Sequence, residues 1–241
     1  MPNIRKVVKK LIPTNLFRTI EPYGHWAESI IMNVRYGFPS RGMHVIGVTG
    51  TNGKTTTTLL IQKMLSQAGI KTGVLSTVAY GIDDDIKPQI EHITTAQASV
   101  LQRRLRDFKR AGVEWVVLES SSHSLAQHRT WGVPYEIAVM TNVTYEHLDY
   151  HRTFERYLAA KRRLFTLAAK NGRKFGVVNA EDPNAQKFID SVPRSVTYGI
   201  KKGKLRASKI KLAGDHSTFT AKIDKDTYDI RINIPGDFNV S

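Results

Sequence analysis

The sequence predicts an α/β fold, a mainly parallel sheet of the P-loop type flanked by helices, with a small antiparallel β-sheet near the C-terminus. Three observations predict it. Strand-like and helix-like segments alternate from residue 44, which is typical of strands joined by helical crossovers. A glycine-rich turn at residues 47–53 links the first strand to the first helix. After about residue 195, short alternating segments separated by polar turns favour antiparallel hairpins.

Hydrophobic periodicity and capping residues place the individual elements. Parallel strands are predicted at 44–49, 73–78, 114–119, 137–141 and 175–179. Helices are predicted at 54–68 with Gly69 ending the helix, from an N-cap at Thr94 or Thr95 to Arg110, at 153–170, and in a short segment opened by Asp182-Pro183. Antiparallel strands are predicted at 207–212, 217–223 and 227–232.

The chain divides into a short basic N-terminal appendage, residues 1–43, and a nucleotide-binding domain, residues 44–241. Within the appendage, residues 23–36 have the pattern of an amphipathic helix. Two interpretations fit it: packing on the domain, which we favour because apolar stripes usually face a core, or lying on a membrane surface. The second predicts a peripheral membrane contact through residues 1–42.

Composition limits the classes of function. Lys and Arg number 36 against 21 Asp and Glu, a net charge of +15, which favours anionic ligands. No motif of a nucleic-acid-binding fold accompanies this charge, so we expect no specific nucleic-acid partner. The absence of cysteine excludes disulfides and thiolate metal sites. Neither a signal peptide nor an apolar run of transmembrane length is present, and we expect a cytoplasmic protein.

The glycine-rich turn carries the most information about function. It ends in Gly50-Thr51-Asn52-Gly53-Lys54-Thr55, and Thr56 follows in the predicted helix. Glycines let backbone N–H groups approach phosphate oxygens, the lysine neutralises the terminal phosphates, and the threonine hydroxyl binds Mg²⁺. These residues predict a nucleoside triphosphate site. The common motif has glycine where this chain has Val48, which indicates a narrower class.

Two further segments follow the ends of predicted strands, where ligands bind in open α/β sheets. Glu119 ends one strand, and a carboxylate there is placed to bind the same Mg²⁺ as Thr55. Beyond the next strand, residues 147–151 hold two histidines and an aspartate, a cluster suited to metal or phosphate binding. Lys161 lies on a predicted helix rich in arginine, so its residue type alone does not identify it as a functional residue.

Four motifs, in this order, resemble the central ATPase domain of the Mur ligases, and most closely the MurE branch. They are Gly-Thr-Asn-Gly-Lys-Thr at 50–55, Glu-Ser-Ser-Ser-His-Ser-Leu-Ala-Gln-His-Arg at 119–129, Thr-Asn-Val-Thr-Tyr-Glu-His-Leu-Asp-Tyr-His at 141–151 and Ala-Ala-Lys at 159–161. The resemblance covers about residues 44–241. It implies an ATP- and Mg²⁺-dependent ligase of peptidoglycan precursor synthesis, which joins an amino acid to a muramyl peptide through an acyl phosphate.

The resemblance also implies roles for individual residues. Lys54, Lys161 and His147 are the implied catalytic residues, and Lys161 is expected to be N-carboxylated. Metal binding is implied for Thr55, Glu119, His147 and Lys161. Nucleotide binding is implied for Gly50, Thr51, Asn52, Gly53, Lys54, Thr55, Thr56, Asn142 and Asn239. Contact with the muramyl peptide is implied for Thr94, Thr95, Ser122, Gln127 and Arg129.

Three departures from the family pattern bear on these expectations. The usual Thr-Thr-Pro reads Thr94-Thr95-Ala96, only about 43 residues precede the first strand of the domain, and the C-terminal ligase domain is expected to be absent. We therefore expect nucleotide binding but little ligation from the 241 residues alone. Two alternatives stay open: a ligase like folylpolyglutamate synthetase, and a non-catalytic nucleotide-binding module that works with a partner.

Overall fold

The computed structural model describes residues 14–89 and 95–234. Its helices are α2 (Thr14–Arg35), α3 (Lys54–Gln67), α4 (Ala98–Arg110), α5 (Ser122–Ala126), α6 (Leu148–His151), α7 (Phe154–Ala168) and α8 (Ala185–Ile189). Its strands are β1 (His44–Thr49), β2 (Thr72–Leu75), β3 (Ala79–Ile82), β4 (Asp85–Pro88), β5 (Trp115–Glu119), β6 (Tyr135–Met140), β7 (Phe175–Asn179), β8 (Arg194–Gly199), β9 (Leu205–Leu212), β10 (Ser217–Ile223) and β11 (Asp226–Ile232).

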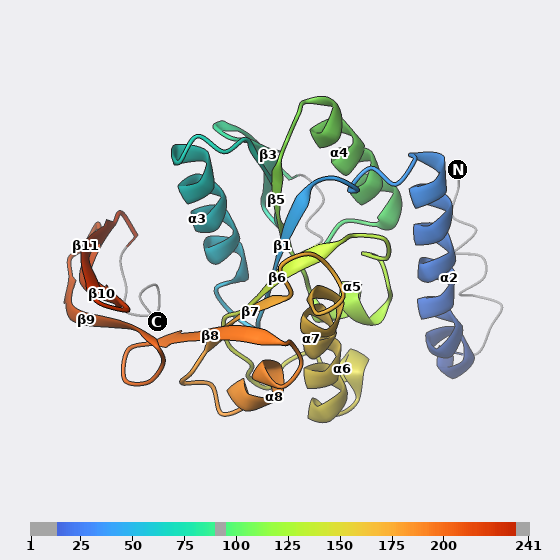
Figure 1. The fold of residues 1–241 in the computed structure, drawn as a ribbon. Helices are drawn as coiled ribbons and strands as arrows, with labels where there is room; N and C mark the ends of the chain where they lie inside the picture. The colour runs from blue at the N-terminus through green and yellow to red at the C-terminus, as the bar shows by residue number, and fades with distance from the viewer. Residues whose placement is uncertain (1–13, 90–94, 235–241) are drawn as a thin grey trace.

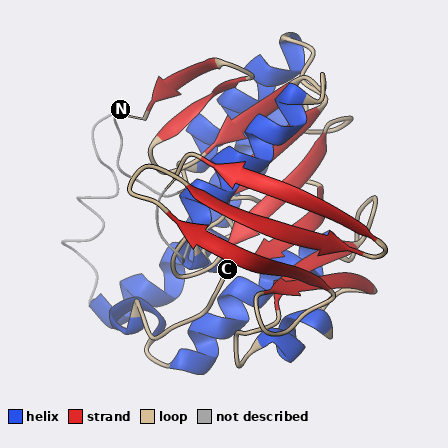
Figure 2. Cartoon of the chain, turned by 90° about the vertical axis from the view of Figure 1, so that its left-hand side faces the viewer, coloured by secondary structure: helices blue, strands red, loops and turns tan. Residues whose placement is uncertain are grey.

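The described strands form one sheet in the order β11-β10-β9-β8-β7-β6-β1-β5-β2-β3-β4. The strands from β8 to β2 in this order pair in parallel. Antiparallel strands extend both edges, β3 and β4 at one and β10 and β11 at the other. Figure 2 shows the long C-terminal strands crossing in front of the parallel ones. The predicted fold class is confirmed, although a short parallel pairing of β8 with β9 joins the C-terminal strands to the main sheet.

Helices cover both faces of the parallel strands (Figure 1). Alternate residues of β1 face opposite layers, as the twofold period of a strand requires. Ile46 and Val48 pack with Ile61 and Leu65 of α3, whereas Val45 belongs to the larger core cluster that α4, α7 and α8 contribute to. Gly47 is required on that second face because a Cβ there would meet the side chains of Leu164 and Tyr135. The sheet is therefore closely covered beneath the glycine-rich turn.

Helix α2 packs on the domain through polar side chains, which differs from the predicted packing by an apolar stripe. His25, Ser29 and Asn33 are fully buried. Ser29 Oγ donates a hydrogen bond to the carbonyl of His128 (3.0 Å), and Asn33 Nδ2 donates to that of Trp131 (2.7 Å). Short polar side chains are used here because the loop after α5 presents backbone carbonyls that need donors. The apolar stripe of α2 faces outward.

Several predicted boundaries were wrong. Thr95 does not cap α4, which begins at Ala98 after Gln97, because the Thr95 hydroxyl binds the backbone beside β5. The strand predicted at 73–78 ends at Leu75, and the hairpin of β3 and β4 that follows was missed. Strand β8 and the short helices α5 and α6 were also missed, because four to six residues are too few to establish a period.

Replacing Gly73 of β2 by alanine is expected to lower the free energy of unfolding by about 1–3 kcal/mol. The new Cβ would lie 2.6 Å from a ring carbon of Phe108 in the packed core. Gly24→Ala is the matched control, because no heavy atom lies within 4 Å of that Cβ and alanine favours the helix by about 1 kcal/mol. Urea unfolding measures both; a Gly73→Ala variant as stable as the wild type contradicts this account of the core.

Candidate functional site

The turn between β1 and α3 has a backbone that favours glycine at two positions. Gly53 precedes α3 with φ +78°, in the left-handed region. A Cβ at Gly50 would collide with the hydroxyl of Thr141. The turn therefore lies directly against the end of β6, and the N-terminus of α3 points its unpaired N–H groups toward the space above the turn.

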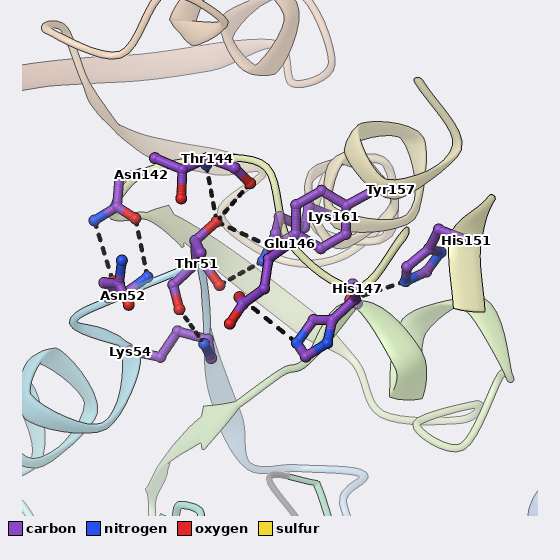
Figure 3. A network of polar contacts seen from close by, with 12 residues as sticks. Thr51, Asn52, Lys54, Asn142, Thr144, Glu146, His147, His151, Tyr157 and Lys161 are labelled. Carbon is purple, nitrogen blue, oxygen red and sulfur yellow. Dashed lines mark hydrogen bonds and ion pairs between the residues drawn. The ribbon is translucent and has the colours of Figure 1, made fainter. Parts of the chain in front are cut away.

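A second loop, between β6 and α6, holds the turn in place (Figure 3). Asn142 Oδ1 accepts from the backbone N–H of Asn52 at 2.9 Å, and Asn142 Nδ2 donates to the Asn52 carbonyl at 3.2 Å. The Thr51 hydroxyl accepts from the N–H of Thr144 at 2.9 Å and lies 2.9 Å from the phenol oxygen of Tyr157 on α7. These contacts fix the turn before any ligand binds.

Two lysines converge on the turn from opposite elements. Lys54, at the start of α3, donates a hydrogen bond to the Thr51 carbonyl (2.7 Å), and Lys161, from α7, donates to the Gly50 carbonyl. Lys161 is 2% exposed, and its Nζ lies 4.6 Å from the ring centre of Tyr157. Both amino groups therefore lie against backbone carbonyls of the turn that the motif predicts to bind phosphate.

The environment of Lys161 favours its neutral form. Burial, assisted by repulsion from Lys54, lowers the pKa of Lys161 to about 7. Burial also lowers the pKa of Lys54, although attraction to Glu119 opposes this. A neutral amine at physiological pH is unusual for lysine and is typical of lysines that react as nucleophiles.

The Glu119 carboxylate lies beside the helix start, as predicted. Its side chain is 1% exposed and accepts hydrogen bonds from the Thr55 hydroxyl (2.9 Å) and from both the N–H and the hydroxyl of Thr77 (2.9 Å each). The two oxygen ligands expected for Mg²⁺, from Thr55 and Glu119, are thus in direct contact. This donor set fits a magnesium ion, which prefers carboxylate and hydroxyl oxygens together with phosphate oxygens.

The second predicted metal pair is His147 and Lys161. His147 has φ +55°, a side chain about half exposed, and a 3.6 Å contact with the Glu146 carboxylate. The ring centre of Tyr157 lies 6.2 Å from that of His147 and 4.6 Å from Lys161 Nζ. In the described residues no group of three His, Cys, Asp or Glu side chains is arranged to hold a metal ion. Lysine as an ammonium is no metal ligand, so the present donors fit a second ion only if Lys161 carries a carboxylate.

Four of the predicted peptide-contacting residues lie in or beside α5, namely Thr95, Ser122, Gln127 and Arg129. Ser122 Oγ is 3.0 Å from His151 Nε2, and burial lowers the pKa of His151 to about 4, so this histidine is neutral. Gln127 is buried, and its Oε1 has no hydrogen-bond partner among the described residues. Arg129 donates to the Thr95 carbonyl (3.3 Å). Thr94 and Asn239 lie outside the described residues.

Sequence reasoning missed Thr77, Thr141 and Tyr157, which hold Glu119, Asn52 and Thr51. Tyr157 had a usable signal, because it lies four residues before Lys161 and therefore on the same helix face. Thr77 and Thr141 had none, since threonines at strand ends are common and their partners are distant in sequence. Thr56 lies in the first turn of α3, as predicted.

We expect Asn142→Ala to weaken binding of Mg²⁺-ATP by up to about thirtyfold, because the turn loses two hydrogen bonds that hold residue 52, each worth about 1 kcal/mol. Asn171→Ala is the control, since that side chain binds only the end of α7. Isothermal titration calorimetry measures both affinities. Equal affinity in the two variants would show that the second loop does not shape the nucleotide site.

Comparison with known proteins gives a consistent family. The model of the Mur ligase middle domain matches residues 48–241. The chain is 38% identical over 241 residues to a UDP-N-acetylmuramoyl-L-alanyl-D-glutamate--2,6-diaminopimelate ligase of Geobacillus thermodenitrificans, an alignment that covers 97% of the chain and 49% of the relative. A UDP-N-acetylmuramyl-tripeptide synthetase of Roseiflexus sp. is 38% identical over 219 residues, 85% of the chain and 43% of the relative. The chain thus spans about half the length of these relatives.

Solved structures agree. A UDP-N-acetylmuramoyl-L-alanyl-D-glutamate--2,6-diaminopimelate ligase superposes with a TM-score of 0.76 at 30% identity, over 92% of this chain and 45% of that one. The folylpolyglutamate synthase of Mycobacterium tuberculosis has the same fold, with a TM-score of 0.72 at 15% identity over 89% of this chain and 55% of that one. The family model matches most of the chain, and the matched residues include the glycine-rich turn. The chain therefore belongs to the Mur ligase family.

Proposed function

We propose that this chain is the ATP-binding centre of a ligase that adds an amino acid to a muramyl peptide. The observation that carries the proposal is the convergence of Lys54 and Lys161 on a preformed phosphate-binding turn, with Thr55 and Glu119 in contact beside it. The muramyl peptide as substrate is supported by the names of the relatives, which describe ligases of UDP-muramyl peptides.

The chemistry has two steps. A carboxylate oxygen of the muramyl peptide attacks the γ-phosphorus of ATP and ADP leaves, which forms an acyl phosphate. The amine nitrogen of the amino acid then attacks the acyl carbon, phosphate leaves and the nitrogen loses a proton to give the amide. Lys54 stabilises the negative charge that builds up on the transferred phosphoryl group. Mg²⁺ held by Thr55 and Glu119 would supply further charge neutralisation.

Lys54→Ala is expected to reduce the affinity for Mg²⁺-ATP at least tenfold and to abolish phosphoryl transfer, because it removes the lysine at the start of α3 that contacts the turn. Lys63→Ala is the control, since Lys63 lies exposed on the same helix and pairs with Asp84 at the surface. Calorimetry measures the affinity, and release of ADP measures transfer.

Acceptor-dependent ADP release also separates the candidate functions. Release that depends on a muramyl dipeptide supports the proposal, whereas release with a folate acceptor supports the folylpolyglutamate alternative. Tight ATP binding without release in the natural full-length protein favours a non-catalytic module. Phosphoryl transfer by Lys54→Ala at the wild-type rate contradicts the assignment.

We also propose that Lys161 is N-carboxylated. The neutral Nζ attacks the carbon of CO₂, an N–C bond forms and one proton is released to solvent. The product is a carbamate whose oxygens, with His147, suit a second Mg²⁺. Burial of Lys161 and its lowered pKa support this, because only the neutral amine reacts.

With ¹³C-labelled CO₂, NMR is expected to show one carbamate resonance that Lys161→Ala removes. Its intensity should fall as pH falls below about 7, since protonation of the amine opposes the reaction. Lys54→Met should move this loss to higher pH, because the repulsion that lowers the Lys161 pKa disappears. Lys170→Ala is the control, because Lys170 is an exposed lysine just after the end of α7. A resonance that persists in Lys161→Ala contradicts the proposal.

A cytoplasmic location at the inner face of the membrane is a further part of the proposed function. Along α2, Ile20, Tyr23, Ile31 and Val34 share one outward face and are 46–67% exposed. Arg35, Arg106, Lys109 and Arg110 line a basic hollow at the end of this helix. Apolar side chains bordered by cations are typical of surfaces that bind anionic lipid. No described helix has the length and apolarity needed to cross a bilayer.

The double variant Ile31→Ser/Val34→Ser is expected to lose co-sedimentation with phosphatidylglycerol vesicles, since it removes two apolar contacts from the exposed stripe. Met64→Ser is the control, because Met64 is 70% exposed on α3. Equal sedimentation of the wild type with anionic and zwitterionic vesicles, or unchanged binding of the double variant, contradicts the membrane contact.

A further inference from the structure

Two adjoining cavities lie on the side of α7 that faces away from the glycine-rich turn. One has a volume of about 510 Å³ and is lined by Ala126, Tyr150, His151, Arg152, Arg156, Ala159, Ala160 and Arg163. The other, of about 470 Å³, continues from Arg163 toward Trp131 and Arg41. We call the first cavity, with the arginines 152, 156 and 163, the arginine groove.

The groove is built from one face of α7. Arg156, Ala159, Ala160 and Arg163 have the i, i+3, i+4, i+7 spacing of a single helix face. The two alanines leave the floor open between the two arginines, and Arg152 joins them from the end of α6. Figure 1 shows α5, α6 and α7 side by side, the three elements that border the groove.

The charge of the groove is not balanced by carboxylates. Among the described residues, no ion pair joins a carboxylate to Arg152, Arg156 or Arg163. The half-buried Arg163 guanidinium instead lies 2.8 Å from each ring nitrogen of His128. Histidine has no anionic form near neutral pH, and burial lowers the pKa of His128, so it brings no negative charge to the guanidinium. Arginines that present several donors without a carboxylate partner are the usual ligands of phosphate groups.

The groove begins next to the residues expected to bind the peptide. His151, in its wall, contacts Ser122 Oγ at 3.0 Å, and Tyr150 beside it also lines the groove. A helix with its side chains is about 10–12 Å across. An extended chain covers about 3.5 Å per residue, so a muramyl sugar with two amino acids spans the distance from the lysine side of α7 to its arginine side.

We propose that the arginine groove binds the diphosphate of the muramyl substrate while the peptide carboxylate lies at Lys54 and Lys161. The inference rests on the proposed function and identifies where the anionic end of its substrate binds. The groove recognises the diphosphate itself, which occurs both in a nucleotide-linked and in a lipid-linked muramyl peptide. Three guanidinium groups supply more than enough positive charge for the two negative charges of such a diphosphate.

The test compares the affinities of three compounds for the 241-residue chain in low salt with Mg²⁺-AMPPCP present. They are a muramyl dipeptide without diphosphate, the UDP-linked dipeptide and a farnesyl-diphosphate-linked dipeptide. The diphosphate is expected to tighten binding at least tenfold. In Arg152→Gln/Arg156→Gln most of this gain should disappear, with the affinity for the diphosphate-free dipeptide unchanged. Arg206→Gln, an exposed arginine of β9, is the control and should keep the full gain.

The outcomes separate this inference from the proposed function. If the diphosphate-free dipeptide binds but the diphosphate adds nothing, or if the double variant keeps the gain, the groove inference is overturned and the proposed function stands. If no muramyl compound binds while Mg²⁺-AMPPCP does, both are overturned. A gain that depends on the arginines supports the inference with either linked compound, and the tighter of the two identifies the source of the diphosphate.

Discussion

The contact between the glycine-rich turn and the loop after β6 is the constraint on which the site depends. Asn142 binds the backbone of Asn52 on both sides, and the Thr51 hydroxyl is held by Thr144 and Tyr157. Since β1 and β6 are adjacent parallel strands, their carboxyl ends bring these loops together. The sheet order thereby determines the shape of the turn, and binding a triphosphate needs little further ordering of this backbone.

Lys54 and Lys161 place positive charge beside this fixed turn. Two cations held above one turn repel each other, and the repulsion contributes to the lowered pKa of Lys161. This repulsion destabilises the site without ligand. A bound anion, or a carboxylate formed on Lys161, relieves the repulsion. Functional sites often retain such unfavourable arrangements. The same reasoning applies to the arginine groove, where the charge of Arg163 is buried against a neutral histidine.

Much of the fold and of the nucleotide site could be predicted from sequence. Strands β1, β5 and β7 are continuous apolar runs, and the turn at 50–55 is a local motif, so both are visible without distant contacts. Features that depend on distant partners were not predictable. Thr95 binds the backbone beside β5 instead of capping α4, and α2 buries polar side chains because distant carbonyls need donors. Lys161 was identified only by the family resemblance, since its burial depends on how α7 packs.

A crystal structure of the chain with Mg²⁺ and a non-hydrolysable ATP analogue tests the central claim most directly. The β- and γ-phosphates are expected to lie on the backbone N–H groups of residues 53–55, with an unchanged backbone in the turn, because the N–H groups of Thr51 and Asn52 stay bound to Asn142. Lys54 Nζ is expected to move from the Thr51 carbonyl to a phosphate oxygen, while Thr55 and Glu119 lie at the metal. A nucleotide bound elsewhere, or a Lys54 that keeps its bond to Thr51 with the nucleotide present, would contradict this claim.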